Sequence, residues 1–338
     1  MAEFVAQVGK LREQASPLSA QKSSLVARTA EAGFWDNPVE AHKVGAQIHR
    51  CDVVLDRLEQ LWKSTRSLDE QVTRLGQNHR ELAKLEDRLE ELEARSAFAA
   101  GVMQCREPEM LGDAVVTLTC LATQGKPLHG VERLAKMYQK LAHRYRFDVE
   151  VLDDQPENGG PGDTVSLLIG GVGAYLLLAR EAGQHHISKR RGGGKETKSV
   201  ERDVIRVEVG LVPPGELPLK RQDVRADVRA VRDLPKRLLK QPKFEVDLLH
   251  MPSMVSLRVH AEGEEDELIE RLLPLVWSKV SAVQKPRDEA SAETPIVRRY
   301  RLGNAPLVKD LRTGRKTGRA DDVFSGRLDL FLTPLEAT

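Results

Sequence analysis

Three segments near the carboxyl terminus carry the most specific pattern in this 338-residue chain: Ile296–Leu302 (IVRRYRL), Val308–Gly314 (VKDLRTG) and Gly326–Phe331 (GRLDLF). The first is rich in β-branched and aromatic residues and is predicted to be a strand. A polar stretch of Lys, Pro, Arg, Asp and Glu, residues 284–294, precedes it and is typical of a linker. We therefore expect the chain to return to strand structure after this linker.

The residues before the linker predict an α+β region with two units. Runs separated by turns are expected to form strands at 114–122, 147–152, 164–169, 174–179 and 204–209, with a helix at 131–146. Strands at 225–231, 244–249 and 256–260 and an amphipathic helix at 265–283 predict a second, smaller α+β unit. This order is not that of a doubly wound sheet.

The first hundred residues predict helices. They are rich in Leu, Ala, Glu, Arg and Gln and almost free of Gly and Pro, except around the break at Phe34–Pro38. A stripe of leucines at helical spacing runs along one face: Leu75, Leu82, Leu85, Leu89 and Leu92. We expect a helical hairpin or a three-helix coiled coil in which the stripe packs inside the protein and not against a partner helix.

Composition restricts the class of protein. The net charge is only +1 although 30% of the residues are charged, so a surface for a polyanion must come from local clustering. Such clustering occurs between residues 186 and 243, where 16 Lys and Arg stand against 8 Asp and Glu. The three cysteines, Cys51, Cys105 and Cys120, form no C-x-x-C pair and predict neither a disulfide framework nor a zinc site. Without a signal-like or membrane-spanning run, a cytoplasmic protein with no membrane contact is expected.

The carboxyl-terminal segments resemble the signature of bacterial class I peptide chain release factors, in which an Ile-Arg-x-Tyr strand precedes Lys-Asp-x-Arg-Thr-Gly and Gly-x-Leu-Asp-x-Phe. The resemblance is to the release factor 2 type, which reads UGA and UAA. Further matches lie at Phe34–Pro38 (FWDNP), Leu134–Tyr138 (LAKMY), Gly173–Tyr175 and Gly183–His186. The resemblance implies a helical coiled-coil domain (1–104), a split codon-recognition body (105–222 and 285–338) and an inserted peptidyl-hydrolysis-like domain (223–284).

The releasing motif of the family, Gly-Gly-Gln, is missing from its expected place. The strands that bracket it in the family are recognisable as Arg225–Arg229 and His250–Val255, but the segment between them, Asp233–Lys243 (DLPKRLLKQPK), contains no glycine. Ester hydrolysis needs backbone amides close to the developing oxyanion and a glutamine that orders water. We therefore expect no peptidyl-tRNA hydrolysis and assign no catalytic residue.

A similar tetrapeptide, Ala182–His185 (AGQH), follows an apolar run and is predicted to lie at a strand end within the body, which favours a structural role over a catalytic one. The pair His185-His186 has no Cys or carboxylate at ligand spacing, so buried or RNA-facing side chains are favoured over a metal site. No metal or cofactor is expected.

The codon-reading Ser-Pro-Phe of the family is also missing, and Lys189–Lys195 (KRRGGGK) stands in its place. The downstream His-Thr-Ser is absent, and Ala122–Pro127 replaces a Gly-Gly-Thr-Glu-Ala turn. Reading of bases depends on shape and on contacts to base edges. A basic, glycine-rich loop supplies mainly attraction to phosphates.

Two basic loops and the carboxyl-terminal signature supply the candidate RNA-binding residues. They are Lys189, Arg190, Arg191, Gly192, Gly193, Gly194, Lys195 and Lys198; Lys236, Arg237, Lys240 and Lys243; and Lys309 and Arg312. One such loop alone is more simply a solvated surface loop, but both fall where the family would contact RNA. Aromatic residues, at 4%, are too scarce for a platform that stacks single-stranded bases.

The resemblance implies a monomeric ribosome-binding factor. It would occupy the A site, against rRNA and P-site tRNA or mRNA, without releasing peptide, in rescue, hibernation or regulation. Two alternatives stay open: an RNA-binding protein that acts away from the ribosome, and an active release factor in translation termination.

Overall fold

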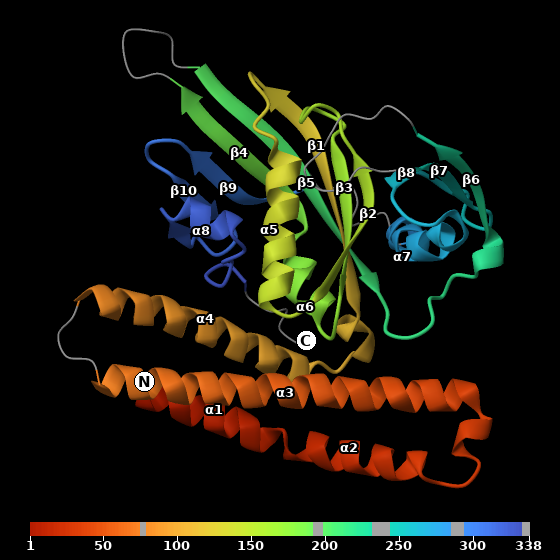
Figure 1. Ribbon diagram of the computed structural model, residues 1–338. Helices are drawn as coiled ribbons and strands as arrows, with labels where there is room; N and C mark the ends of the chain where they lie inside the picture. The colour runs from red at the N-terminus through yellow and green to blue at the C-terminus, as the bar shows by residue number, and fades with distance from the viewer. Residues whose placement is uncertain (75–78, 192–198, 232–243, 285–293, 333–338) are drawn as a thin grey trace. The chain divides into compact units, whose positions relative to one another are not determined.

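The computed structural model describes residues 1–74, 79–191, 199–231, 244–284 and 294–332 (Figure 1). The chain divides into a first compact unit that comprises Met1–Leu111 and a second that comprises Gly112–Phe331. All three cysteines are free thiols. Within the described residues, no helix combines the length and the apolar content needed to cross a bilayer.

The first unit is helical, as predicted. It contains α1 (Ala2–Gln14), α2 (Ser16–Thr29), η1 (Phe34–Asp36), α3 (Pro38–Arg74), α4 (His79–Gln104) and the short η2 (Pro108–Leu111). The predicted break is confirmed, because Gly33 adopts a positive φ of 79° before η1 and Pro38 begins α3.

The packing seam of this unit lies on α3. Its buried residues recur at spacings of three and four: Cys51, Val54, Leu58, Leu61, Thr65 and Leu68. This is coiled-coil spacing, and α3 contacts α1, α2 and α4. The predicted leucine stripe contributes less, since Leu92 is buried but Leu82 is 37% exposed. Leu75 lies outside the described residues.

The second unit is built on an eight-stranded sheet in the order β11-β10-β9-β4-β5-β1-β3-β2. The strands are β1 (Asp113–Gln124), β2 (Asp148–Gln155), β3 (Thr164–Gly170), β4 (Gly183–Arg191), β5 (Ser199–Val212), β9 (Ile296–Leu302), β10 (Leu307–Asp310) and β11 (Lys316–Thr317). β4 and β9 run parallel, and the other neighbours run antiparallel. The chain therefore does return to the sheet after the linker.

Helix α5 (Gly130–Arg144) covers one face of this sheet and packs on β1, β2, β3 and β5 (Figure 1). Short helices α6 (Ala174–Leu178) and α8 (Ala320–Phe324) and the 3-10 turns η3 (Ala179–Glu181) and η4 (Arg221–Asp223) complete the unit. The strand predicted at 174–179 is wrong, because α6 occupies these residues. Its apolar run is buried nearly all round, and burial of that kind gives no periodicity to separate a helix from a strand.

The elements predicted for the smaller unit are present as a three-stranded sheet with one helix, within the second compact unit. The smaller unit consists of β6 (Val224–Ala230), β7 (Phe244–His250), β8 (Val255–Ala261) and α7 (Glu265–Gln284), with sheet order β6-β7-β8. Helix α7 contacts β1, β2, β3 and β5 of the large sheet. Val115 and Leu168 of the large sheet pack against α7, and they alternate along their strands with the residues that lie under α5. Since successive side chains of a strand point to opposite faces, α5 and α7 cover opposite faces of the large sheet.

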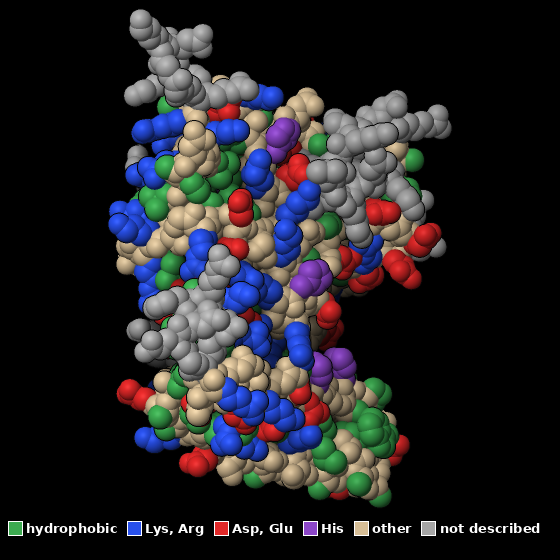
Figure 2. All heavy atoms as spheres, turned by 60° about the vertical axis from the view of Figure 1, so that its left-hand side comes forward, with side chains coloured by type: hydrophobic (Ala, Val, Ile, Leu, Met, Phe, Trp, Pro, Cys, Tyr) green, Lys and Arg blue, Asp and Glu red, His purple; other side chains and the backbone are tan. Residues whose placement is uncertain are grey.

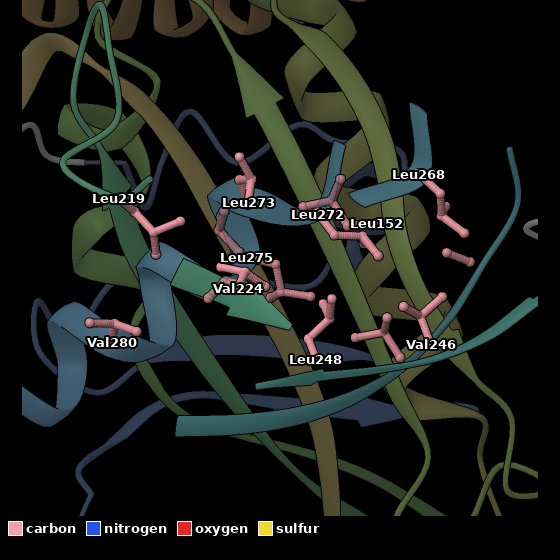
Figure 3. Packing of buried hydrophobic residues seen from close by; sticks show 14 of the residues in the cluster. Leu152, Leu219, Val224, Val246, Leu248, Leu268, Leu272, Leu273, Leu275 and Val280 are labelled. Carbon is pink, nitrogen blue, oxygen red and sulfur yellow. The ribbon is translucent and has the colours of Figure 1, made fainter. Parts of the chain in front are cut away.

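The small unit and the large sheet share a hydrophobic core. Figure 3 shows Leu152 of β2 among leucines of α7, and Val115 and Val212 belong to the same cluster. A Cβ on Gly210 would lie 1.9 Å from Ser278 Oγ, so only glycine lets α7 approach β5 this closely. Lys279 Nζ donates to Glu208 Oε2 at 2.6 Å across the same contact.

Candidate nucleic-acid interface

The first basic segment closes the hairpin between β4 and β5. The ladder runs to the pair Arg191↔Ser199, so Gly192–Lys198 joins the two strands and lies outside the described residues. Lys189 and Arg190 are exposed at the end of β4. The prediction that Lys189–Arg191 belong to a loop is wrong, because these residues continue the ladder opposite Glu201, Val200 and Ser199.

The second basic segment joins β6 to β7. These strands pair in full from Val224↔His250 to Ala230↔Phe244. The expected first bracket, Arg225–Arg229, therefore lies in β6 beside β7, and the expected second bracket, His250–Val255, spans the end of β7 and the turn to β8. Lys236, Arg237, Lys240 and Lys243 lie outside the described residues.

The turn before α5 is tied to the sheet by one buried carboxylate. Asp203 Oδ2 of β5 accepts the backbone N–H of Leu128 at 3.0 Å and of Gly130 at 3.1 Å, and Oδ1 accepts the hydroxyl of Thr123 at 3.1 Å. These hydrogen bonds fix the start of α5, which follows the segment Ala122–Pro127.

The carboxyl-terminal signature builds a buried ionic network under the sheet. Arg298 of β9 is 0% exposed and donates to both carboxylate oxygens of Glu181, at 2.7 and 2.8 Å. It also reaches Asp310 Oδ2 at 3.3 Å, and its guanidinium lies 4.7 Å from the centre of the Phe331 ring. The signature residues Arg298, Asp310 and Phe331 thus hold β9, β10 and the segment Gly326–Phe331 together.

Arg312 belongs partly to this network. Its Nη2 donates to Asp310 Oδ2 at 2.9 Å, and its Nη1 donates to the carbonyl of Arg180. Its side chain remains 30% exposed. Both signature cations predicted to bind RNA, Lys309 and Arg312, are exposed, and Arg312 also has a structural role.

The electrostatics of the network match this arrangement. Burial alone would raise the pKa of Glu181, but the Arg298 guanidinium outweighs it and holds that pKa below its usual value. Burial would likewise raise the pKa of Asp310, but hydrogen bonds from Arg312 and the Thr313 amide lower it to about 2. Glu181 and Asp310 are therefore ionised at neutral pH.

His185 joins the network as a neutral imidazole. It is 0% exposed, and its ring nitrogens lie 3.1 Å from Tyr300 Oη and 3.0 Å from the Glu181 carbonyl oxygen. Burial lowers its pKa to about 4. His186 points to the opposite face of the sheet. Among the residues that the structure describes, no group of three or more His, Cys, Asp and Glu could hold a metal ion.

This network was not predicted from the sequence. Its signal is the presence of ionisable residues between apolar ones, as at Arg298 beside Val297, since a charge in a buried strand must be paired.

Gly183 has a structural reason to be glycine. It begins β4 with a φ of 141°, and a Cβ there would lie 2.4 Å from Val297 Cγ2 and 2.7 Å from the Pro295 carbonyl oxygen. The neighbouring Gln184 donates its backbone N–H to that same carbonyl at 2.8 Å. The tetrapeptide Ala182–His185 is therefore part of the β4–β9 contact.

Gly183→Ala is expected to lower the free energy of unfolding by about 1–3 kcal/mol, because it combines backbone strain with a steric clash. Gln184→Ala, which keeps the backbone, should stay within about 0.5 kcal/mol. Urea denaturation of both variants makes the comparison. Equal stability of Gly183→Ala and the unsubstituted protein would show that the glycine is not needed for packing.

The chain is similar to peptide chain release factors along most of its length. A family model described as the PCRF domain matches residues 18–191. Peptide chain release factor 2 of Kineococcus radiotolerans is 23% identical over 98% of this chain and 96% of its own length. Peptide chain release factor 1 of Carboxydothermus hydrogenoformans is 25% identical over 91% of this chain and 89% of its own length. RF2 of Thermus thermophilus has a similar fold, with a TM-score of 0.53, 22% identity and 93% coverage of each chain.

Proposed function

Since the chain belongs to the class I peptide chain release factor family, as its PCRF domain shows, we propose that it is a cytoplasmic, monomeric ribosome-binding factor that occupies the A site without hydrolysing peptidyl-tRNA. Rescue, hibernation and regulation of translation are the roles that such binding would serve. The relatives named above are release factors, and the family implies ribosome binding.

The observation that carries the proposal is the connection between β6 and β7. The ladder pairs the two strands on either side, and by the resemblance to release factors the sequence that joins them corresponds to the segment that carries Gly-Gly-Gln in the family. That sequence, VRDLPKRLLKQPK from Val231 to Lys243, offers no glycine to bring backbone amides up to an ester. It offers several cations instead, which suit contact with RNA phosphates.

The β4–β5 hairpin supports binding without base reading. Lys189 and Arg190 extend the strand pair towards Gly192–Lys198 (GGGKETK), a sequence with no aromatic or proline to shape a pocket for a base. Phosphate contacts position a protein on RNA, whereas base-edge contacts specify sequence. We therefore expect binding that depends little on the codon in the A site.

Sedimentation with ribosomes through a sucrose cushion tests the binding. Ribosomes carrying tRNA in the P site and a vacant A site should pellet the protein, with similar affinity at stop and sense codons. An active release factor added in excess should displace it. Failure to pellet, together with binding to protein-free RNA, would contradict the proposal and favour the alternative of an RNA-binding protein acting away from the ribosome.

A further inference from the structure

One face of the large sheet carries a row of cations that come from segments far apart in the sequence. Strand register places His186 of β4 beside Arg299 of β9, Arg299 opposite Lys309 of β10, and Lys309 opposite Lys316 of β11. Neighbouring strands lie about 4.8 Å apart, so these side chains form a continuous line.

Alternate residues of the same strands extend this line into a surface. We define the basic sheet face by seven residues that point to this side: Arg190, Arg202, Arg206, Arg299, Arg301, Lys309 and Lys316. The intervening residues Asp203, Ile205, Arg298 and Tyr300 point to the α5 side and are buried. Figure 2, in which the left-hand side of Figure 1 with β4, β9 and β10 comes forward, shows many Lys and Arg side chains along that edge of the second unit.

The basic sheet face is open to solvent. Six of its seven cations are exposed, and Arg206 retains 41% of its side-chain surface. Helix α7, which covers this side of the sheet over β1, β2, β3 and β5, has no comparable contact with β9 or β10. The face therefore begins where the cover by the small unit ends.

These cations have few carboxylate partners. Arg206 lies 3.5 Å from Glu208, which also accepts Lys279 at 2.6 Å. Arg190, Arg202, Arg299, Lys309 and Lys316 pair with no carboxylate of the described chain. Like charges opposite one another on adjacent strands destabilise a sheet, so this arrangement is unfavourable until an anion covers it.

The pKa of the half-buried His186 reflects the positive charge of this face. Burial lowers its pKa, and the positive charges of Arg202 and Arg299 lower it further. The outward positions of these strands carry no Phe, Tyr or Trp on which a single-stranded base could stack. A broad cationic surface without stacking residues suits the phosphate backbone of a helix.

We propose that the basic sheet face binds the phosphodiester backbone of double-stranded RNA. Within the proposed function, on which this inference rests for the identity of the RNA, the ligand is a helix of ribosomal RNA that the bound protein lies against. Binding would be independent of sequence and strongly dependent on salt.

The test pairs two charge-reversal variants with the same change in net charge. Arg299→Glu with Lys309→Glu alters adjacent residues of the face. Lys140→Glu with Lys220→Glu, at exposed residues on α5 and outside the sheet, is the control. Fluorescence anisotropy would follow binding to an RNA hairpin with a stem of about 20 base pairs, longer than the roughly 16 that a double-stranded-RNA domain spans. Oligouridine is the single-stranded probe, and sedimentation with ribosomes is run in parallel.

We expect the Arg299/Lys309 variant to bind the hairpin at least about tenfold more weakly, with a salt slope lower by about 2, and to pellet less with ribosomes. The control should match the unsubstituted protein.

If both variants bind the hairpin equally well, the inference is overturned, but the proposed binding to ribosomes is not. Weaker ribosome binding with unchanged hairpin binding would also overturn it, since the face would then contact ribosomal protein. If the unsubstituted protein binds oligouridine as tightly as the hairpin, the preference for double-stranded RNA is refuted. If the unsubstituted protein does not pellet with ribosomes at all, the proposed function is contradicted. The anisotropy measurement with the hairpin then still tests whether the basic sheet face binds double-stranded RNA.

Discussion

Replacement of Arg298 with methionine should lower the free energy of unfolding by about 3–5 kcal/mol. The guanidinium is 0% exposed and is the main partner of Glu181, which is 1% exposed. Asp310 would keep Arg312, but Glu181 would lose its bidentate cation and keep the Tyr138 hydroxyl at 3.0 Å and a 3.6 Å approach from Arg312. A buried carboxylate that loses its partner bears the full cost of desolvation, which is why removal of one member costs more than the pair contributes.

Urea denaturation monitored by circular dichroism measures this loss. The matched control is Arg301→Met, two residues along the same strand, where the exposed side chain donates to the Ala305 carbonyl at 2.8 Å. We expect the control to change stability by about 0.5 kcal/mol or less. Similar losses for the two variants would mean that the buried network does not hold β9 in the sheet.

The sequence was sufficient to predict most elements of the second unit. The strand Ile296–Leu302 was predicted with its observed bounds, and α7 was predicted to within one residue at its end. Both have local patterns that match their final environment: β-branched and aromatic residues in a strand, and an amphipathic face on a helix that covers a sheet. The helix α6 was missed because complete burial removes the periodicity on which such predictions rest.

The functional surfaces were harder to predict for a physical reason. The basic loops are contiguous in sequence and could be named in advance. The buried network joins Glu181 to Arg298, 117 residues apart, and the basic sheet face joins Arg202 to Arg299. The parallel pairing of β4 with β9 brings these residues together, and nothing local in either segment specifies that partner. Arg299 and Arg301 alternate with buried residues of β9, and this alternation is the sequence pattern that indicates an outward-facing basic strand.

A second large effect is expected in catalysis. Loss of a single oxyanion-hole donor costs an enzyme about 10²–10³ in rate. The β6–β7 connection contains no glycine, and its one glutamine, Gln241, stands between Lys240 and Pro242 and does not follow a glycine pair. We therefore expect the protein to release peptide at least about 10²-fold more slowly than an active release factor at the same concentration. Its cations should nevertheless let it compete for the same ribosomes.

Peptide release from ribosomes that hold formylmethionyl-tRNA in the P site and UGA or UAA in the A site tests binding without release most directly. The account predicts that the protein alone releases no more formylmethionine than buffer does, and that prior addition of the protein slows release by an active release factor. Release above background that depends on the stop codon, and that is absent at a sense codon, would contradict it.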